Sequence, residues 1–473
     1  MLTITAALSL ALAVAAAPSA VEKSTLSPDA FSSALSVDGI MSHLQAFAGF
    51  AAAGVNRAHG TSGYNASADY VAKVAEQAGL KVSRQSVLEE LGQVTIGQLT
   101  VNGVVYESPT VVLDAYTNAT EVGGSAGELV SLPGSGCEQE DFAGTDGKVV
   151  LVMLGECDDN AKVFNSMQAK NLAIILYGDV APAANPYVEV PGRFVVPVVL
   201  HTGISTAQEL LGQIENGTVD ALVNVQIESV MVPGDNVVAQ TSWGSQEKVI
   251  MFGAHLDSVQ AGPGINDNGS GSATLLEMVK QLANFNHAEY AIRFGWWAAE
   301  ERGLHGSKQY VQQLSESERD QIAAYINLDM TGSPNYKLGV QDNSNSAGQN
   351  PPWISVPAGS VAIERILQEA FRSDGQNSVP TPVSSASDHA SFMAMGIPSG
   401  YLESGAGARK TALEAELFGG VAGERYDSCY HQLCDNMNNV SPDALIHNAR
   451  AAGRAMAILA NDISAIEEEQ RSG

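Results

Sequence analysis

The chain has 473 residues, and 45% of them are hydrophobic, which is typical of globular proteins and excludes a disordered chain. It carries 24 Lys and Arg against 52 Asp and Glu, a formal net charge of −28. A surface this acidic repels the phosphate backbone of nucleic acids, so nucleic-acid partners are excluded. The length allows two or three domains, whereas the charge identifies no substrate.

The N-terminus has the pattern of a targeting segment. Residues 1–17 (MLTITAALSLALAVAAA) form a short apolar stretch that ends in small residues before Pro18. This pattern predicts a secretory signal peptide, although its first residues carry no positive charge; a buried N-terminal helix is the alternative. No later stretch approaches the ~18 uncharged apolar residues of a membrane span. We therefore expect a secreted, extracellular protein without a membrane segment.

The chain between residues 18 and 94 opens an α/β domain. Its periodicity predicts a helix, a loop, a second helix and a short edge strand over about residues 38–86. From about residue 95 to 232 the pattern changes to short β-branched runs punctuated by Gly and Pro, with helical pieces at 161–170 and 207–215. We interpret residues 95–232 as a compact inserted domain.

Residues 233–473 return to an alternation of strands and helices. The predicted strands are KVIMFGAH (248–255), YAIRFGWWA (290–298) and AAYINLDM (323–330). The predicted helices cover 272–285, 306–314 and 362–373. Nearly uninterrupted apolar strands that alternate with amphipathic helices indicate a mostly parallel central sheet with helices on both faces, an α/β fold.

Five potential metal ligands lie in order along the chain, most of them where an apolar run gives way to a polar loop. They are His255, Asp267, Glu301, Asp329 and His431. In parallel sheets, ligands bind at the carboxyl ends of the strands, which explains how residues distant in sequence can share one site. Histidine nitrogens and carboxylate oxygens hold catalytic zinc and leave one position open for water. The pattern therefore predicts a two-zinc hydrolase.

The charges of this set balance. Two Zn²⁺ bring +4, the three carboxylates supply −3, and a bridging hydroxide supplies −1, which would let zinc lower the pKa of the water towards ~7. Glu300 stands beside a ligand and is free to take the proton from the attacking water and deliver it to the leaving amine. Each of these residues also has an ordinary structural interpretation. Glu300 and Glu301 could lie in the solvated first turn of a helix, where negative charge is favourable. Asp329 could cap a helix or form a salt bridge, and His255 could be an ordinary loop histidine.

Two further residues have candidate functions next to the ligands. Asp257 lies two residues after His255, where a carboxylate can orient a metal-bound imidazole. Tyr430 and His431 lie in the segment SCYHQLCD, and a disulfide across this segment would hold His431 and leave the Tyr430 hydroxyl facing a developing oxyanion. A stapled surface loop with incidental polar residues is the alternative.

The four cysteines allow three pairings, and an exported chain permits disulfides. Sequence distance separates them into two neighbouring couples, so the simplest prediction pairs Cys137 with Cys157 and Cys429 with Cys434. A zinc site built from cysteines is the competing interpretation, but neither couple has the C-x-x-C spacing usual in such sites.

Export also makes N-glycosylation an expectation at several of the five Asn-x-Ser/Thr sequons. These lie at Asn65, Asn118, Asn216, Asn268 and Asn439. Asn268 adjoins a proposed metal ligand, and we expect it not to be glycosylated.

The segments that carry these residues resemble the co-catalytic two-zinc aminopeptidases of clan MH, a group that includes secreted leucine aminopeptidases and vacuolar aminopeptidase Y. The resemblance covers about residues 38–462 and includes the order and approximate spacing of every ligand. It implies the zinc exopeptidase fold and two zinc ions, with Asp267 bridging and Glu300 as general base. It also implies that Tyr430 polarises the carbonyl and Asp257 supports a ligand. The remaining ligands implied for one or other zinc ion are His255, Asp329, Glu301 and His431.

The inserted domain is similar to the small β-rich protease-associated domain of many such enzymes, on the segments GCEQEDFAGTDGKVVLVMLGEC and AKVFNSMQAKNLAIILYGD. Its cysteine pair fits this resemblance.

Two segments depart from the pattern of the family. Where the family commonly has G-R-S-D, this chain has Ser384-Ser385-Ala386-Ser387-Asp388, so the arginine is absent. Where the family often has L-F-T-G-A, Glu403 replaces the aromatic residue. Both changes make the expected substrate pocket more negative or less aromatic. We predict Met330 as an apolar wall of that pocket, and a Glu403 that faces it should improve tolerance of Lys or Arg at the substrate N-terminus.

The best interpretation is a monomeric zinc aminopeptidase that acts on peptides and proteins with a free N-terminus. One alternative is a zinc carboxypeptidase or deacylase on the same scaffold, which needs a cation to bind a substrate carboxylate. The other is a non-enzymatic, receptor-like ectodomain, which would be expected to have lost ligands and kept a membrane anchor.

Overall fold

The computed structural model describes residues 24–54, 56–114, 116–157, 159–178, 187–188 and 196–472. The predicted signal peptide, residues 1–17, lies outside the described residues. Within the described residues, no helix is both long and apolar enough to cross a membrane.

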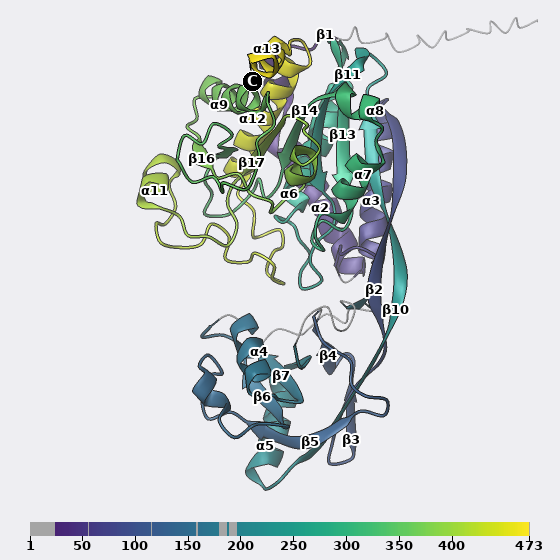
Figure 1. Cartoon of the computed structure of the whole chain (residues 1–473), viewed down its shortest axis with the longest axis vertical. Coiled ribbons are helices and arrows are strands. Elements are labelled where there is room, and N and C mark those ends of the chain that lie inside the picture. The colour runs from purple at the N-terminus through teal and green to yellow at the C-terminus, as the bar shows by residue number, and fades with distance from the viewer. Residues whose placement is uncertain are drawn as a thin grey trace, which may run out of the picture.

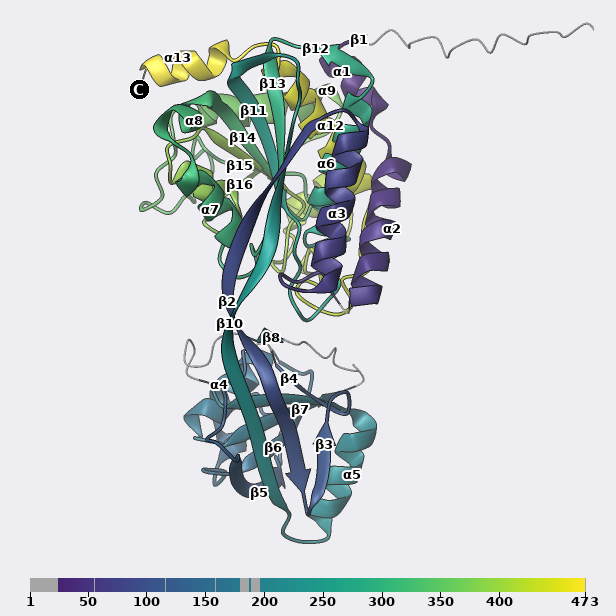
Figure 2. The same cartoon turned by 90° about the vertical axis from the view of Figure 1, so that its right-hand side faces the viewer.

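Two domains lie one above the other and are joined by two long antiparallel strands (Figures 1 and 2). The strands β2 (Lys81–Val101) and β10 (Asp220–Gln240) pair with each other from end to end. The predicted short edge strand is therefore one end of a 21-residue strand that continues into the smaller domain. The predicted domain boundaries, 94/95 and 232/233, fall inside these two strands.

The larger domain is built on a central sheet whose middle strands are parallel, as predicted. The strand β11 (Ser245–His255) pairs in parallel with β13 (Tyr290–Trp297) and with β14 (Ile322–Leu328). Next to β14 follows β17 (Ser399–Glu403), also parallel. The sheet becomes mixed towards its edges, because β10 is antiparallel to β13, and β15 (Gly339–Gln341) is antiparallel to β17. The remaining short strands are β16 (Val379–Thr381), β1 (Ser24–Thr25) and β12 (Phe285–His287).

Helices cover both faces of this sheet. Side chains alternate along each buried strand, so both faces of the sheet are apolar and pack against helices. Ile250 and Phe252 of β11 pack into the larger core, whereas Val249 and Met251 point to the opposite face. The helices that contribute most to the larger core are α1 (Pro28–Ala34), α2 (Val37–Gly54), α3 (Ser62–Gln77), α6 (Gly269–Leu282), α9 (Ser360–Ser373) and α12 (Pro442–Leu459), and Ile466 adds one buried side chain from the C-terminal helix. The opposite face packs against α7 (His305–Gln313) and α10 (His389–Met393). The other helices are α8 (Glu316–Gln321), α11 (Ala412–Phe418) and α13 (Ser464–Ser472).

The smaller domain has its own sheet between two apolar clusters. Its central strands β6 (Val149–Met153), β7 (Ala173–Gly178) and β9 (Val198–Gly203) run parallel to one another. The predicted helical pieces are present as α4 (Asp159–Gln168) and α5 (Ile204–Glu215). The remaining elements are β3 (Val104–Glu107), β4 (Val111–Leu113), β5 (Ser125–Ser131), β8 (Tyr187–Val188) and a 3₁₀ turn at Gln139–Phe142. The predicted disulfide between Cys137 and Cys157 is present, with Cα atoms 5.8 Å apart.

The direction of β10 decides which edge of the larger domain faces the smaller one. The N-terminal end of β10 pairs with β5 in the smaller domain, and its C-terminal end pairs with β13 in the larger domain. Because β13 is antiparallel to β10, and β11 and β14 run with β13, their carboxyl ends point towards the smaller domain. The loops that follow these strands therefore lie at the end of the sheet that faces the smaller domain (Figure 1).

A matched pair of leucines tests the assignment of the larger core. Leu276 of α6 is fully buried, whereas Leu413 of α11 is 62% exposed. We expect Leu276→Ala to lower the free energy of unfolding by about 2–5 kcal/mol, and Leu413→Ala to change it by no more than about 0.5 kcal/mol. Urea unfolding followed by tryptophan fluorescence measures both. Equal losses in the two variants would contradict the assignment of α6 to the core.

Candidate active site

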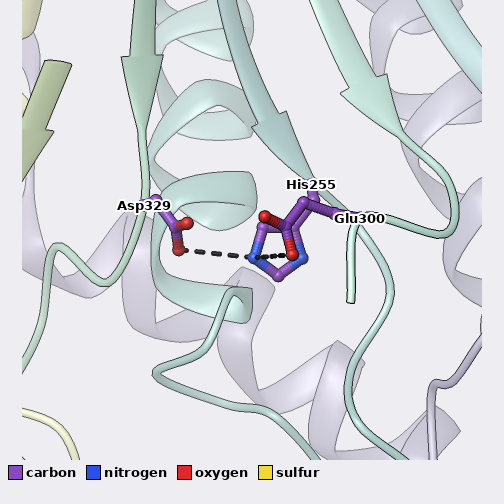
Figure 3. Close-up of side chains that lie close together, drawn as sticks. All are labelled: His255, Glu300 and Asp329. Atoms are coloured by element: carbon purple, nitrogen blue, oxygen red, sulfur yellow. Dashed lines mark ion pairs between the residues drawn. The ribbon is translucent and has the colours of Figure 1, made fainter. Parts of the chain in front are cut away.

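Three neighbouring strand ends bring the predicted residues together. His255 is the last residue of β11, Asp329 follows β14, and Glu300 and Glu301 lie in the turn after β13. In Figure 3 the side chains of His255, Glu300 and Asp329 point towards one another. Their ligand atoms lie within 4.8 Å of one another. The cluster therefore lies where three neighbouring parallel strands end.

Asp267 places its two carboxylate oxygens against two different histidines. Its Oδ1 lies 3.3 Å from Nε2 of His255, and its Oδ2 lies 3.1 Å from Nε2 of His431. Beyond these contacts, Asp329 Oδ1 lies 3.3 Å from the first imidazole, and Glu301 Oε2 lies 3.2 Å from the second. The residues thus form two groups of three potential ligands that share one carboxylate.

The cluster holds more negative charge than two imidazoles can balance. Burial, reinforced by Asp267, raises the pKa of Glu301 to about 7. Burial alone would lower the pKa of His431, yet Asp267 and Glu301 raise it to about 10. Among the described residues, no donor hydrogen-bonds to Oε1 of Glu301 or Oδ1 of Asp329, although both atoms are buried.

This donor set fits divalent cations. Two imidazoles supply nitrogen ligands and three carboxylates supply oxygen ligands, a mixture that suits zinc in particular. Bound cations would also supply the positive charge that the buried carboxylates require.

Asp257 acts on its neighbours in two ways. Its backbone carbonyl oxygen lies 3.1 Å from Nδ1 of His255, which leaves Nε2 of that imidazole to face the ligand cluster. Its carboxylate oxygens accept the backbone N–H groups of Glu300 at 3.1 Å and Glu301 at 3.3 Å, and Oδ1 also lies 3.7 Å from Nδ1 of His255. The side chain of Asp257 therefore positions the two adjacent glutamates, while its main chain orients the histidine.

A buried arginine that the sequence analysis missed holds the loop between His255 and Asp267. The guanidinium of Arg57 donates hydrogen bonds to three carbonyl oxygens of this loop, those of Leu256, Pro263 and Gly264. Burial lowers the pKa of Arg57 to about 10, so the group stays charged at neutral pH. It lies far from the ligands in sequence, and no local pattern identifies its partners.

A second missed residue, Asp435, links the two loops that supply Asp267 and His431. Its carboxylate accepts the backbone N–H groups of Asn266 at 2.8 Å and Asp267 at 3.0 Å. The side chain of Asn439 donates to this carboxylate as well. Asn439 is only 6% exposed and is engaged in this network, so its sequon has no room for a glycan.

Asp329 ends a chain of hydrogen bonds that starts in the core. Trp297 donates to Tyr325 at 2.8 Å, Tyr325 to Asn327 at 2.7 Å, and Asn327 to Ser387 at 2.8 Å. Ser387 then donates to Asp329 Oδ2 at 2.7 Å. This chain leaves Oδ1 of Asp329 to face the cluster. Ser387 lies in the segment that lacks the arginine of the family pattern.

A cavity opens beside the cluster, and the predicted substrate residues line it. Besides four of the ligands (Asp267, Glu301, Asp329 and His431) and Glu300, its lining comprises Met330, Thr381, Ser384, Ala386, Tyr401, Glu403, Ala406 and Tyr430. The ring of Tyr430 stacks on that of His431, with centroids 3.9 Å apart. The predicted disulfide between Cys429 and Cys434 is present and closes the loop that carries both residues.

Comparison with known sequences identifies the family. Residues 236–456 match Peptidase family M28, and residues 125–208 match the PA domain. The chain is 38% identical over 420 residues to the aminopeptidase of Pseudomonas aeruginosa, covering 83% of this chain and 75% of that protein. It is 38% identical over 375 residues to the probable leucine aminopeptidase 2 of Aspergillus fumigatus, covering 78% and 72%.

The fold is also that of a solved structure. A zinc aminopeptidase from Bacillus subtilis superposes with a TM-score of 0.67 at 23% identity, covering 91% of this chain and 98% of that one. The chain belongs to peptidase family M28 of clan MH, with a PA domain inserted. The class of enzyme predicted from the sequence, a metalloaminopeptidase, is thereby confirmed.

The contacts of Asp257 give a prediction for its side chain. Asp257→Asn replaces one acceptor by an NH₂ group that faces a backbone N–H, so Glu300 and Glu301 should shift. Changes to residues that support metal ligands lower metal affinity or activity by roughly 10- to 100-fold, and we expect such a loss of kcat/KM here. Asp443→Asn at the start of α12 is the control. Full activity of Asp257→Asn at unchanged metal content would contradict the positioning of the glutamates.

Proposed function

We propose that this M28 enzyme is a zinc-dependent aminopeptidase that removes single residues from the free N-terminus of peptides and proteins. The observation that supports the proposal most strongly is the shared carboxylate of Asp267, which contacts His255 with one oxygen and His431 with the other. Two metal sites that share one bridging carboxylate are typical of hydrolases that use two metal ions.

In this proposal, two zinc ions bind to the two ligand groups. One group is His255, Asp329 and Asp267, and the other is His431, Glu301 and Asp267. When bound, the zinc ions polarise the scissile carbonyl and lower the pKa of a water molecule.

Glu300 is suited to the proton transfers. It lines the cavity beside the ligands, and its Oε2 lies 3.9 Å from Nε2 of His255. Burial, together with Asp388 and Glu301, raises the pKa of Glu300 well above its ordinary value, so this carboxylate is a stronger base than one in water. Glu300 takes the proton from the attacking water and delivers it to the leaving amine.

Tyr430 is suited to stabilise the negative charge that develops on the carbonyl oxygen. Burial and the surrounding carboxylates raise its pKa far above the ordinary value, so the hydroxyl keeps its proton and can donate it in a hydrogen bond.

Selection for a free N-terminus follows from the charge of the cavity. The carboxylates of Glu300 and Asp329 line the cavity, where they attract the ammonium group of a substrate. Among the described residues that line the cavity there is no Lys or Arg. A carboxypeptidase would need such a cation to bind the substrate carboxylate, so the aminopeptidase is favoured. A receptor-like ectodomain would not need the complete ligand set that is present.

The enzyme would work outside the cell that makes it, as a monomer on peptide substrates. The predicted signal peptide and the two disulfides support export, because disulfides persist in oxidising compartments.

Variants of the two adjacent glutamates, Glu300 and Glu301, distinguish a role in catalysis from a role in metal binding. We expect Glu300→Gln to keep two zinc ions per chain and to lose about 100- to 10,000-fold in kcat, because the base is gone. Glu301→Gln should lose zinc, and added zinc should restore part of its activity. The measurements are metal analysis and hydrolysis of leucine anilide.

A chelator and a blocked substrate serve as controls. Chelation should abolish the activity of the wild type, and zinc should restore it. Leucine anilide with an acetylated amine should resist cleavage. If acetylated substrates were cleaved as fast as free ones, the proposed selection of a free N-terminus would be wrong.

A further inference from the structure

Glu403, the residue expected to make the pocket negative, has a buried partner of opposite charge. Lys337 precedes β15, and its Nζ lies 2.7 Å from Oε1 of Glu403 at the end of β17. The side chains are only 11% and 13% exposed, so solvent screens this ion pair far less than a pair on the surface. Antiparallel pairing of Gly339 with Glu403 places the two elements side by side.

The surroundings hold this pair in one arrangement. Thr381 accepts a hydrogen bond from Lys337 Nζ at 3.1 Å and donates to Glu403 Oε1 at 2.9 Å, so the three side chains form a closed triangle. The ring of Tyr426 lies beneath the ammonium at 5.4 Å from its centroid. A Cβ at Gly339 would lie 2.5 Å from Oγ1 of Thr381, so only glycine leaves room for the triangle.

The pair changes what the cavity offers to a substrate side chain. Glu403 and Thr381 line the cavity, whereas Lys337 is not among its lining residues. The described contacts of Glu403 all use Oε1 and none uses Oε2. The pair of Lys337 and Glu403 is therefore polar but carries no net charge. A cationic side chain would meet a carboxylate that is already neutralised, with an ammonium of the same sign beside it.

We propose that Lys337 determines the specificity of this pocket: by neutralising Glu403 it makes the enzyme prefer an uncharged N-terminal side chain over a cationic one of the same shape. This inference rests on the proposed aminopeptidase function. It revises the expectation from the sequence alone that Glu403 favours N-terminal Lys or Arg.

The test uses two substrates that differ only in charge and four forms of the full-length enzyme. Norleucine anilide and lysine anilide have side chains of nearly equal length, and only lysine carries an ammonium. The enzymes are the wild type, Lys337→Met, Glu403→Gln and the double variant, each loaded with zinc. The readout is the ratio of kcat/KM for norleucine to that for lysine.

We expect the wild type to prefer norleucine. Lys337→Met should lower the ratio by roughly tenfold or more, because the substrate ammonium replaces the lost partner in a charged hydrogen bond. Glu403→Gln should raise the ratio, because an unpaired Lys337 repels lysine. The double variant should return to a ratio near that of the wild type. The double variant should also fold, because it leaves neither charge of the pair buried without its partner.

The outcomes separate this inference from the function on which it rests. If the zinc-loaded wild type hydrolyses neither anilide, the proposed function is wrong. If it hydrolyses both but the ratio is the same in Lys337→Met, the specificity inference alone is wrong. Should Lys337→Met fail to fold in thermal unfolding, Lys337→Gln removes the charge and keeps a hydrogen-bond donor to Thr381. An unchanged ratio in that variant overturns the inference equally.

Discussion

The contact that constrains the rest of the structure is the Asp267 carboxylate between two imidazoles. With its oxygens 3.3 Å from His255 and 3.1 Å from His431, this single side chain joins the end of β11 to a loop near the C-terminus. The two groups of ligands can act together only if these distant segments meet within the width of one carboxylate. Small displacements of either loop would separate the groups and leave buried acids without compensating charge.

The protein meets this constraint with polar contacts to the backbone rather than with apolar packing alone. Arg57 donates to carbonyl oxygens of the loop before Asp267, and Asp435 accepts backbone N–H groups at Asn266 and Asp267 itself. The disulfide between Cys429 and Cys434 closes the loop that carries His431 and restrains its conformation. A ligand loop held at both ends needs little reorganisation when a cation binds, which favours tight binding and a fixed catalytic geometry.

Much of this site was predictable because it follows strand ends. The apolar runs before His255, Glu300 and Asp329 predicted buried parallel strands, and parallel strands place their carboxyl ends at one edge. Residues that act through long-range pairing were not predictable. Lys337 meets Glu403 only because β15 and β17 pair antiparallel, and neither segment has a local pattern that reveals this. The long strands β2 and β10 were also missed, since the alternation of buried and exposed side chains breaks where they pass from one domain to the other.

The most direct test of the central claim is a crystal structure of the zinc-loaded enzyme with anomalous diffraction measured at the zinc absorption edge. The account predicts two anomalous peaks roughly 3.5–4 Å apart. One should contact His255 and Asp329, the other His431 and Glu301, and Asp267 should touch both. A single peak, or two peaks of which Asp267 contacts only one, would contradict the account.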